Sequence, residues 1–142
     1  MVRMVAHFRF RRVLVLGLFC LLCFSLKTYA GEVLDVISFS RGGASLSAEA
    51  KAKLENVAAW AKANPDKRIQ IQGHTDKRGS HEDNMAMGER RAGTIKTFLI
   101  SLGIAGDRMD AVSYGEEAPL IPGDTAEARA KNRRCTLVVL DP

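Results

Sequence analysis

An aspartate and an arginine fifteen residues apart are the side chains of this sequence best suited to bind a charged ligand. Asp76 lies in a short loop between Gly73 and Gly79, and Arg91 lies in a later segment with helical spacing. Arg91 projects from the same stripe as the apolar residues Ile95, Phe98, Leu99 and Leu102. An unpaired guanidinium on a buried face costs several kcal/mol or more, so Arg91 needs a carboxylate from Asp76 or from a ligand.

Two interpretations of this pair remain open at this point. Asn84 and Arg91 are seven residues apart and share a helix face, and the loop 75–80 precedes the helix N-terminus, where free amides attract a carboxylate. Such a site suits an amino-acid zwitterion, with Asp76 on the ammonium and Arg91 on the carboxylate. The spacing alone favours the other interpretation, a structural ion pair between Asp76 and Arg91.

Other chemistry finds less support in the sequence. His74, His81 and Asp76 match no strong zinc pattern, and no cysteine pair accompanies them, so we expect no metal. We find no Ser/His/Asp or Cys/His arrangement with a recognisable nucleophile turn, which leaves only a weak general-base pattern of Asp76 with His74. The run Asn132-Arg133-Arg134 is equally consistent with an anion site and with a solvated entry to a strand.

The first thirty residues have the composition of an export signal. They carry five basic residues and no acidic ones, and an apolar run spans 13–26, too short for a membrane span and typical of a signal peptide. Thr28-Tyr29-Ala30 supplies small residues for cleavage before Gly31. We therefore expect a signal peptide at 1–30 and a single domain at 31–142; an uncleaved membrane anchor is the alternative.

Charge and cysteine content both change when the signal is set aside. The net charge of +5 belongs to residues 1–30, and the remaining 16 basic residues balance 16 acidic ones, which argues against a nucleic-acid partner. Cys135 is then the one cysteine left, so it is expected as a small buried side chain without a disulfide partner. Cys20 and Cys23 are candidates for lipidation, but the bulky Phe19 and Leu22 precede them.

Hydrophobic periodicity predicts an α+β fold. We expect helices at 47–64, with Ser47 as N-cap, and at 83–102, with Gly103 as a left-handed stop, and one or two helical turns at 125–132. We expect strands at 33–39, 68–73, 111–114 and 135–140. The order β-α-β-α-β-(α)-β predicts a two-layer sandwich, with the helices on one face of a mixed four-stranded sheet.

Four segments, GHTDKRGSHEDN, GERRA, SYGEEAP and AKNRRCTLVV, resemble the OmpA-like peptidoglycan-binding domain family, and within it the peptidoglycan-associated lipoproteins. The resemblance covers 33–140 in order and spacing. It implies a non-enzymatic protein that binds the diaminopimelate residue of peptidoglycan stem peptides without a cofactor. Its ligand-binding residues would be Asp76, Arg91, Asn84 and Thr75, with Phe39, Gly79 and Arg134 in support.

The resemblance also implies a periplasmic location, possible association with the outer membrane, and TolB as a possible partner. A lipid-anchored form that acts with TolB is the alternative, and a wall hydrolase or a protein-interaction module without ligand binding are the alternatives from other classes. The chain departs from the family pattern at Ser40-Arg41-Gly42-Gly43, where an acidic or amide residue and a second aromatic are usual, and at Met87, where leucine is usual. It also lacks a convincing lipidation signal and a long linker.

Overall fold

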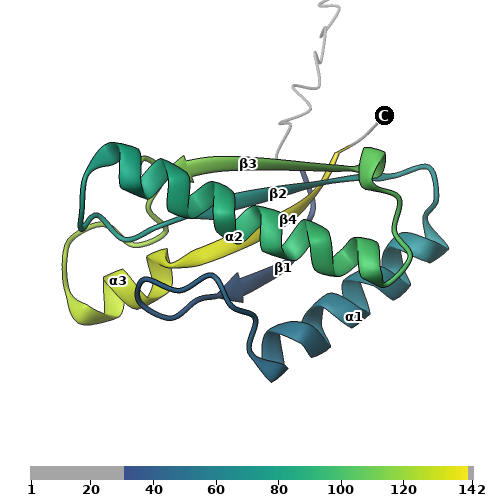
Figure 1. The fold of residues 1–142 in the computed structure, drawn as a ribbon, viewed down its shortest axis with the longest axis horizontal. Coiled ribbons are helices and arrows are strands. Elements are labelled where there is room, and N and C mark those ends of the chain that lie inside the picture. The colour runs from purple at the N-terminus through teal and green to yellow at the C-terminus, as the bar shows by residue number, and fades with distance from the viewer. Residues whose placement is uncertain (1–30, 141–142) are drawn as a thin grey trace, which may run out of the picture.

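A four-stranded mixed sheet forms one layer of the fold (Figure 1). The computed structural model describes residues 31 to 140. The strands are β1 (Val33–Ser38), β2 (Arg68–His74), β3 (Met109–Gly115) and β4 (Arg134–Leu140), in the spatial order β1-β4-β2-β3. β4 runs antiparallel to both β1 and β2, and β3 runs parallel to β2. β2 and β4 are therefore the two central strands. Each pairs with two neighbours, so they bring together segments that are far apart in the sequence.

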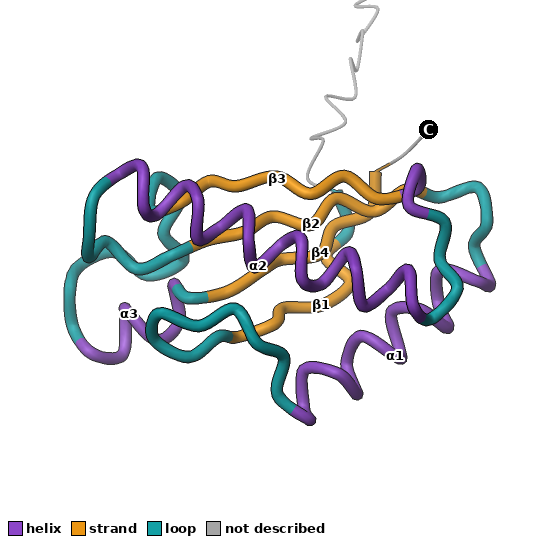
Figure 2. Tube along the Cα trace, viewed as in Figure 1, coloured by secondary structure: helices purple, strands orange, loops and turns teal. Residues whose placement is uncertain are grey.

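Two long helices form the second layer and cover one face of this sheet (Figure 2). They are α1 (Ala48–Ala63) and α2 (His81–Ser101); a 3₁₀ turn, η1 (Gly106–Arg108), and a short helix, α3 (Ala126–Asn132), complete the chain. The predicted fold class and element order are confirmed. Between residues 31 and 140, no helix is long and apolar enough to cross a membrane.

The core lies between the helices and the sheet, and its members follow the alternation seen in the sequence. Ile69 and Ile71 of β2 and Leu137 of β4 are fully buried, while Gln70 and Gln72 between the isoleucines are partly exposed. The apolar stripe of α2 meets these strands through Ile95 and Leu99. Among residues 31 to 140, the buried apolar residues fall between Ile37 and Val139 and come from all four strands and from α1, α2 and α3.

Helix ends agree with the capping residues, with one correction. Ser47 caps α1 by accepting a hydrogen bond from the Ala50 amide, and Gly103 adopts a φ of +94° after α2, both as predicted. However, α2 begins at His81 rather than near residue 83. The Ser80 hydroxyl accepts from the Asp83 amide at 3.1 Å and donates to its carboxylate at 2.7 Å, so Ser80 is the N-cap.

Strand ends also differ slightly from the expectation. β3 extends to Met109–Gly115 because its parallel ladder with β2 starts at the pair Ile69 and Met109.

Cys135 is buried as expected, and burial raises the pKa of its thiol to about 12. The predicted signal peptide at 1–30 and the lipidation candidates Cys20 and Cys23 lie outside the described residues.

Candidate functional site

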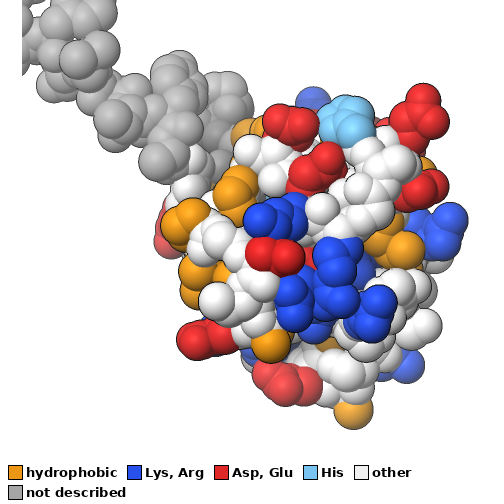
Figure 3. Space-filling view, turned by 90° about the vertical axis from the view of Figure 1, so that its left-hand side faces the viewer, with side chains coloured by type: hydrophobic (Ala, Val, Ile, Leu, Met, Phe, Trp, Pro, Cys, Tyr) orange, Lys and Arg blue, Asp and Glu red, His pale blue; other side chains and the backbone are white. Residues whose placement is uncertain are grey.

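A pocket of about 320 Å³ opens where β2 ends and α2 begins. Its walls are the loop after β2, the first turns of α2, the loop after β1 and the residue before β4. The lining residues are Arg41, Gly42, Thr75, Asp76, Arg78, Gly79, Asp83, Asn84, Met87, Arg91 and Arg133. Figure 3 views this end of the molecule, and Lys and Arg side chains gather at its centre. The four proposed ligand-binding residues Asp76, Arg91, Asn84 and Thr75 therefore share one cavity.

Asp76 is a buried carboxylate that lines this pocket. Its side chain is only 10% exposed, and one carboxylate oxygen forms an ion pair with Arg133 Nη1 at 3.1 Å. The other oxygen accepts a hydrogen bond from the Arg78 amide at 3.1 Å, and Arg78 Nε lies 4.0 Å away. Asp76 is therefore held by two arginines, and neither of them is Arg91.

Arg91 is held by backbone carbonyls instead of a carboxylate. Nε donates to Gly43 O at 2.9 Å, Nη1 to His74 O at 3.0 Å and Nη2 to Ser40 O at 3.2 Å. Burial lowers the pKa of this guanidinium, which is 1% exposed, although an arginine stays charged even so. The structural ion pair between Asp76 and Arg91 does not form. Three carbonyl dipoles stabilise the buried charge in its place.

Thr75 and Asn84 supply polar atoms to the same wall. Both side chains are more than nine-tenths buried. The Thr75 amide donates to Gly115 O at 2.8 Å, which fixes the loop to the end of β3, whereas the Thr75 hydroxyl has no hydrogen-bond partner among the described residues. A buried hydroxyl without a partner is rare in a native fold, and here it lines a cavity that a ligand can fill. Gly79, with a φ of +99°, turns the loop between them.

The three residues expected in support have different positions. Gly79 lines the pocket, and the Phe39 ring lies under the Arg91 guanidinium, 5.2 Å from its carbon, as a cation–π contact. Arg134 does not line the pocket, since its guanidinium turns to Ala118 O at 3.3 Å. The neighbouring Arg133 lines it instead and also donates to Phe39 O at 3.3 Å. Sequence reasoning noticed this arginine pair but selected the other member.

His74 is a packing residue next to the pocket. Its ring is 3% exposed and stacks on Tyr114 with the centroids 5.4 Å apart. Burial lowers its pKa to about 4, and the nearby charge of Arg134 acts in the same direction, while the Ala118 carbonyl opposes them. The ring is therefore neutral at pH 7, and its carbonyl helps to hold Arg91.

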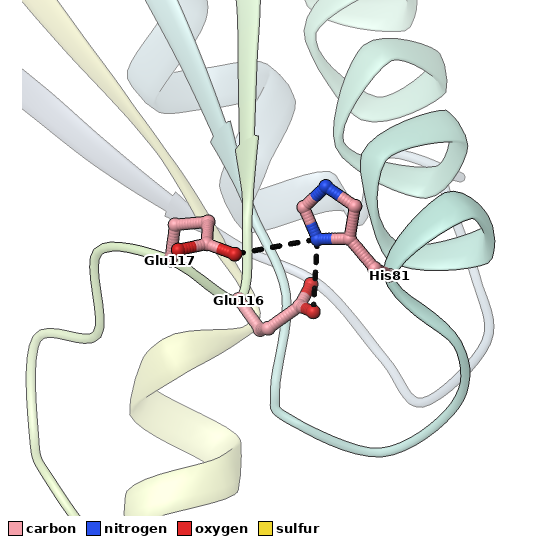
Figure 4. Close-up of side chains that lie close together, drawn as sticks. All are labelled: His81, Glu116 and Glu117. Atoms are coloured by element: carbon pink, nitrogen blue, oxygen red, sulfur yellow. Dashed lines mark hydrogen bonds and ion pairs between the residues drawn. The ribbon is translucent and has the colours of Figure 1, made fainter.

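Among residues 31 to 140, one group of side chains has the spacing to hold a metal ion (Figure 4). It consists of His81, Glu116 and Glu117, with His81 Nδ1 3.2 Å from one carboxylate and 3.3 Å from the other. Burial would raise the pKa of Glu116, but its backbone hydrogen bond, His81 and Asn84 outweigh burial and lower it. The set differs from the His74, His81 and Asp76 trio considered from sequence. His81 and Glu117 are exposed and Glu116 is half-buried. His81 lies in the first turn of α2, where the helix dipole disfavours a cation.

Comparison with known proteins places the chain in a family. Residues 38–133 match the model of the OmpA family. The chain is 37% identical over 115 residues to the peptidoglycan-associated lipoprotein of Rhizobium meliloti, which covers 81% of this chain and 65% of the relative. It is 40% identical over 84 residues to the peptidoglycan-associated lipoprotein of Haemophilus influenzae, covering 59% of this chain and 55% of the relative. The chain thus spans about two thirds or less of the length of these relatives.

Solved structures agree with the fold. The peptidoglycan-associated lipoprotein of Burkholderia pseudomallei superposes with a TM-score of 0.72 at 36% identity, over 74% of this chain and 89% of that one. The C-terminal domain of Helicobacter pylori MotB reaches a TM-score of 0.70 at 22% identity, over 76% and 85%, and supports the fold alone. The lipoprotein relatives are named for association with peptidoglycan, and membership of the OmpA family with these relatives confirms the expectation of a non-enzymatic protein.

Proposed function

We propose that this chain, which belongs to the OmpA family, binds peptidoglycan non-covalently through the diaminopimelate residue of its stem peptides. The observation that carries the proposal is the pocket in which a buried carboxylate, a buried guanidinium and an unpartnered hydroxyl converge: Asp76, Arg91 and Thr75. Diaminopimelate ends in an amine and a carboxylate on one carbon, and this pocket offers one group of opposite charge to each.

The arrangement supports zwitterion capture in the following way. Asp76 accepts the ligand ammonium by sharing its carboxylate with Arg133 or by displacing that side chain. Arg91 spends three of its five N–H groups on carbonyls and keeps two for a ligand carboxylate, beside the amides of the first turn of α2. Thr75 supplies a hydroxyl that donates or accepts. Such charge-assisted bonds contribute roughly 1.5–3 kcal/mol each, so three of them supply about 5–9 kcal/mol before ordering costs, against about 8 kcal/mol for a micromolar complex.

The cell-envelope setting of the proposal follows from the relatives, which are named as peptidoglycan-associated lipoproteins. We propose a periplasmic location for the domain, with association to the outer membrane if Cys20 or Cys23 carries a lipid. An interaction with TolB stays a prediction from the family resemblance. Mass spectrometry of the mature N-terminus distinguishes cleavage before Gly31 from acylation of either cysteine.

Co-sedimentation with isolated sacculi tests the function. The Asp76→Asn change keeps the side-chain volume and removes the charge that holds the ammonium. We expect about a tenfold to hundredfold loss of affinity for diaminopimelate-containing sacculi, the equivalent of one charge-assisted bond. Circular dichroism should show that the variant stays folded, because Asp76 contacts only the loop and Arg133 and contributes nothing to the apolar core.

Glu55→Gln is the matched control, since Glu55 is an exposed acid on α1 far from the pocket lining. It should sediment like the wild type. Equal sedimentation of Asp76→Asn and wild type would disprove the assigned site. Release of soluble muropeptides from the sacculi would instead identify a wall hydrolase. A wild-type protein that stays in the supernatant would favour the remaining alternative, a protein-interaction module without ligand binding.

A further inference from the structure

The pocket carries more positive than negative charge. Four of its lining residues are arginines, Arg41, Arg78, Arg91 and Arg133, against the two carboxylates of Asp76 and Asp83. Figure 3 shows Lys and Arg side chains gathered on this end of the molecule. A zwitterion has no net charge, so it leaves this excess of positive charge unchanged. A ligand with a second carboxylate removes part of it.

Most of the charged groups around the pocket already have partners. Asp76 is paired with Arg133 and accepts the Arg78 amide, and the Asp83 carboxylate accepts the Ser80 hydroxyl at 2.7 Å. Arg91 is bound to three carbonyls. Arg41 differs from all of these, because within residues 31–140 its guanidinium makes no hydrogen bond or ion pair, although it lines the cavity. It is the arginine that a ligand can engage without breaking a contact.

The backbone that carries Arg41 is fixed at the rim of the pocket. The carbonyls of Ser40 and Gly43, on either side of it, both accept hydrogen bonds from Arg91. The Gly43 amide closes a turn onto Ser40 O at 3.2 Å, and Gly42 adopts a φ of +66° within that turn. The side chain of Arg41 therefore starts from a defined point, which lowers the ordering cost of a contact with a ligand.

We infer that Arg41 is a specificity-determining residue that binds a second carboxylate next to the zwitterion. The inference rests on the proposed function. The preferred ligand is then an uncrosslinked stem peptide in which the amine of diaminopimelate is free and the chain ends in a carboxylate at, or one residue beyond, diaminopimelate. Stem peptides whose terminal carboxylate is amidated keep the zwitterion but lose the contact with Arg41.

Calorimetry with three synthetic peptides tests this. The reference is N-acetyl-L-Ala-γ-D-Glu-diaminopimelate with free carboxylates; the second has the chain-terminal carboxylate as a carboxamide, and the third has the diaminopimelate side-chain amine acetylated. The protein is the chain from Gly31, which contains every member of the core seen in residues 31–140. We expect the wild type to bind the carboxamide about twofold to fivefold more weakly than the reference, as for a solvent-exposed ion pair. We expect it not to bind the acetylated peptide.

The Arg41→Gln variant should bind the reference and the carboxamide with the same affinity. That affinity should equal the affinity of the wild type for the carboxamide. This pattern is a double-mutant cycle between one side chain and one ligand group. Arg90→Gln, an exposed arginine outside the pocket lining, removes the same charge and should behave like wild type. A preference for the free carboxylate that persists in Arg41→Gln, or a wild type that binds both peptides alike, would overturn the inference. A wild type that binds none of the three peptides would refute the proposed function itself.

Discussion

Arg91 shows how a buried charge is stabilised without an opposite charge. A guanidinium has five N–H groups in a fixed plane, and three of them point at carbonyls from two separate stretches of backbone. The loop after β1 and the last residue of β2 are thereby joined to α2 at one side chain. Phe39 closes the remaining face of the guanidinium. The residue proposed to bind ligand is therefore also the residue that shapes the pocket.

The Arg91→Lys substitution should impair both folding stability and ligand binding, whereas Asp76→Asn should impair binding alone. A lysine ammonium is a point donor on a flexible stem and does not span three carbonyls, so we expect a loss of about 3 kcal/mol in the free energy of unfolding. Sacculus binding should be lost as well, because the turn at 40–43 loses its anchor. Urea unfolding measures the first effect. Arg90→Lys, the exposed neighbour, should change stability by less than about 0.5 kcal/mol; an Arg91→Lys protein of wild-type stability would contradict this account.

Helix α2 lies directly on the sheet because two glycines face each other. A Cβ on Gly73 of β2 would overlap the backbone of Gly88, and a Cβ on Gly88 would overlap the Ser113 side chain and approach Gly73 O. This close approach sets the height of α2 above β2, and Asn84 and Arg91 lie one turn on either side of Gly88. The geometry of the pocket thus depends on a contact between backbones. By contrast, a Cβ on Gly93, in the same helix, would meet nothing within 4 Å.

Alanine at these two helical glycines should act in opposite directions. Gly93→Ala gains helix propensity without a clash and should raise the free energy of unfolding by about 0.5–1 kcal/mol. Gly88→Ala gains the same propensity but overpacks the interface, and should fall about 1–3 kcal/mol below Gly93→Ala. Chemical denaturation of both variants measures the difference. Two alanine variants of equal stability would show that α2 does not rely on this close approach.

The elements that were predicted from sequence are those with a strong apolar period. Alternation at Ile69 and Ile71 identified β2, and the helical stripe through Ile95 and Leu99 identified α2. Element ends were less accurate, because they depend on partners distant in sequence. Met109 belongs to β3 through its register with Ile69, and no local pattern records that pairing.

The structure brings the candidate residues Asp76, Arg91, Asn84 and Thr75 together, but through connections that the sequence did not predict. Any residue offers a carbonyl, so the three acceptors of Arg91 leave no mark in the sequence, and a carboxylate was the natural partner to expect. Arg133 and Arg134 are chemically identical neighbours, and only their place at the junction of α3 and β4 turns one to Asp76 and the other to Ala118. The only sequence signal for Arg133 is that two arginines stand next to each other. That signal does not reveal which of the two faces the pocket.

At the scale of the whole molecule, buried His74 links stability to pH. Its folded-state pKa of about 4 lies below the ordinary value of 6.5, so between these values the unfolded chain takes up a proton that the folded chain does not. The contribution of His74 to the free energy of unfolding is fully present above pH 6.5 and is lost as the pH falls from 6.5 toward 4. The ring stacks on Tyr114 where β2, β3 and the pocket loop meet, so any unfolding that exposes it must also open the end of the domain that holds the pocket.

His74→Phe keeps an aromatic ring for the stack and removes the titration. Between pH 7.5 and pH 5.0, a range above most carboxylate pKa values, the wild type should lose about 2 kcal/mol of unfolding free energy through this histidine, from 1.36 kcal/mol per pH unit below 6.5. Over the same pH interval, the loss of unfolding free energy in the variant should be smaller than in the wild type by about 2 kcal/mol. This difference does not depend on the stability of the variant at pH 7.5. Urea unfolding at the two pH values gives both differences. A His74→Phe protein that loses as much stability as the wild type would mean that the acid sensitivity originates in other groups, and that His74 takes up its proton without opening the fold.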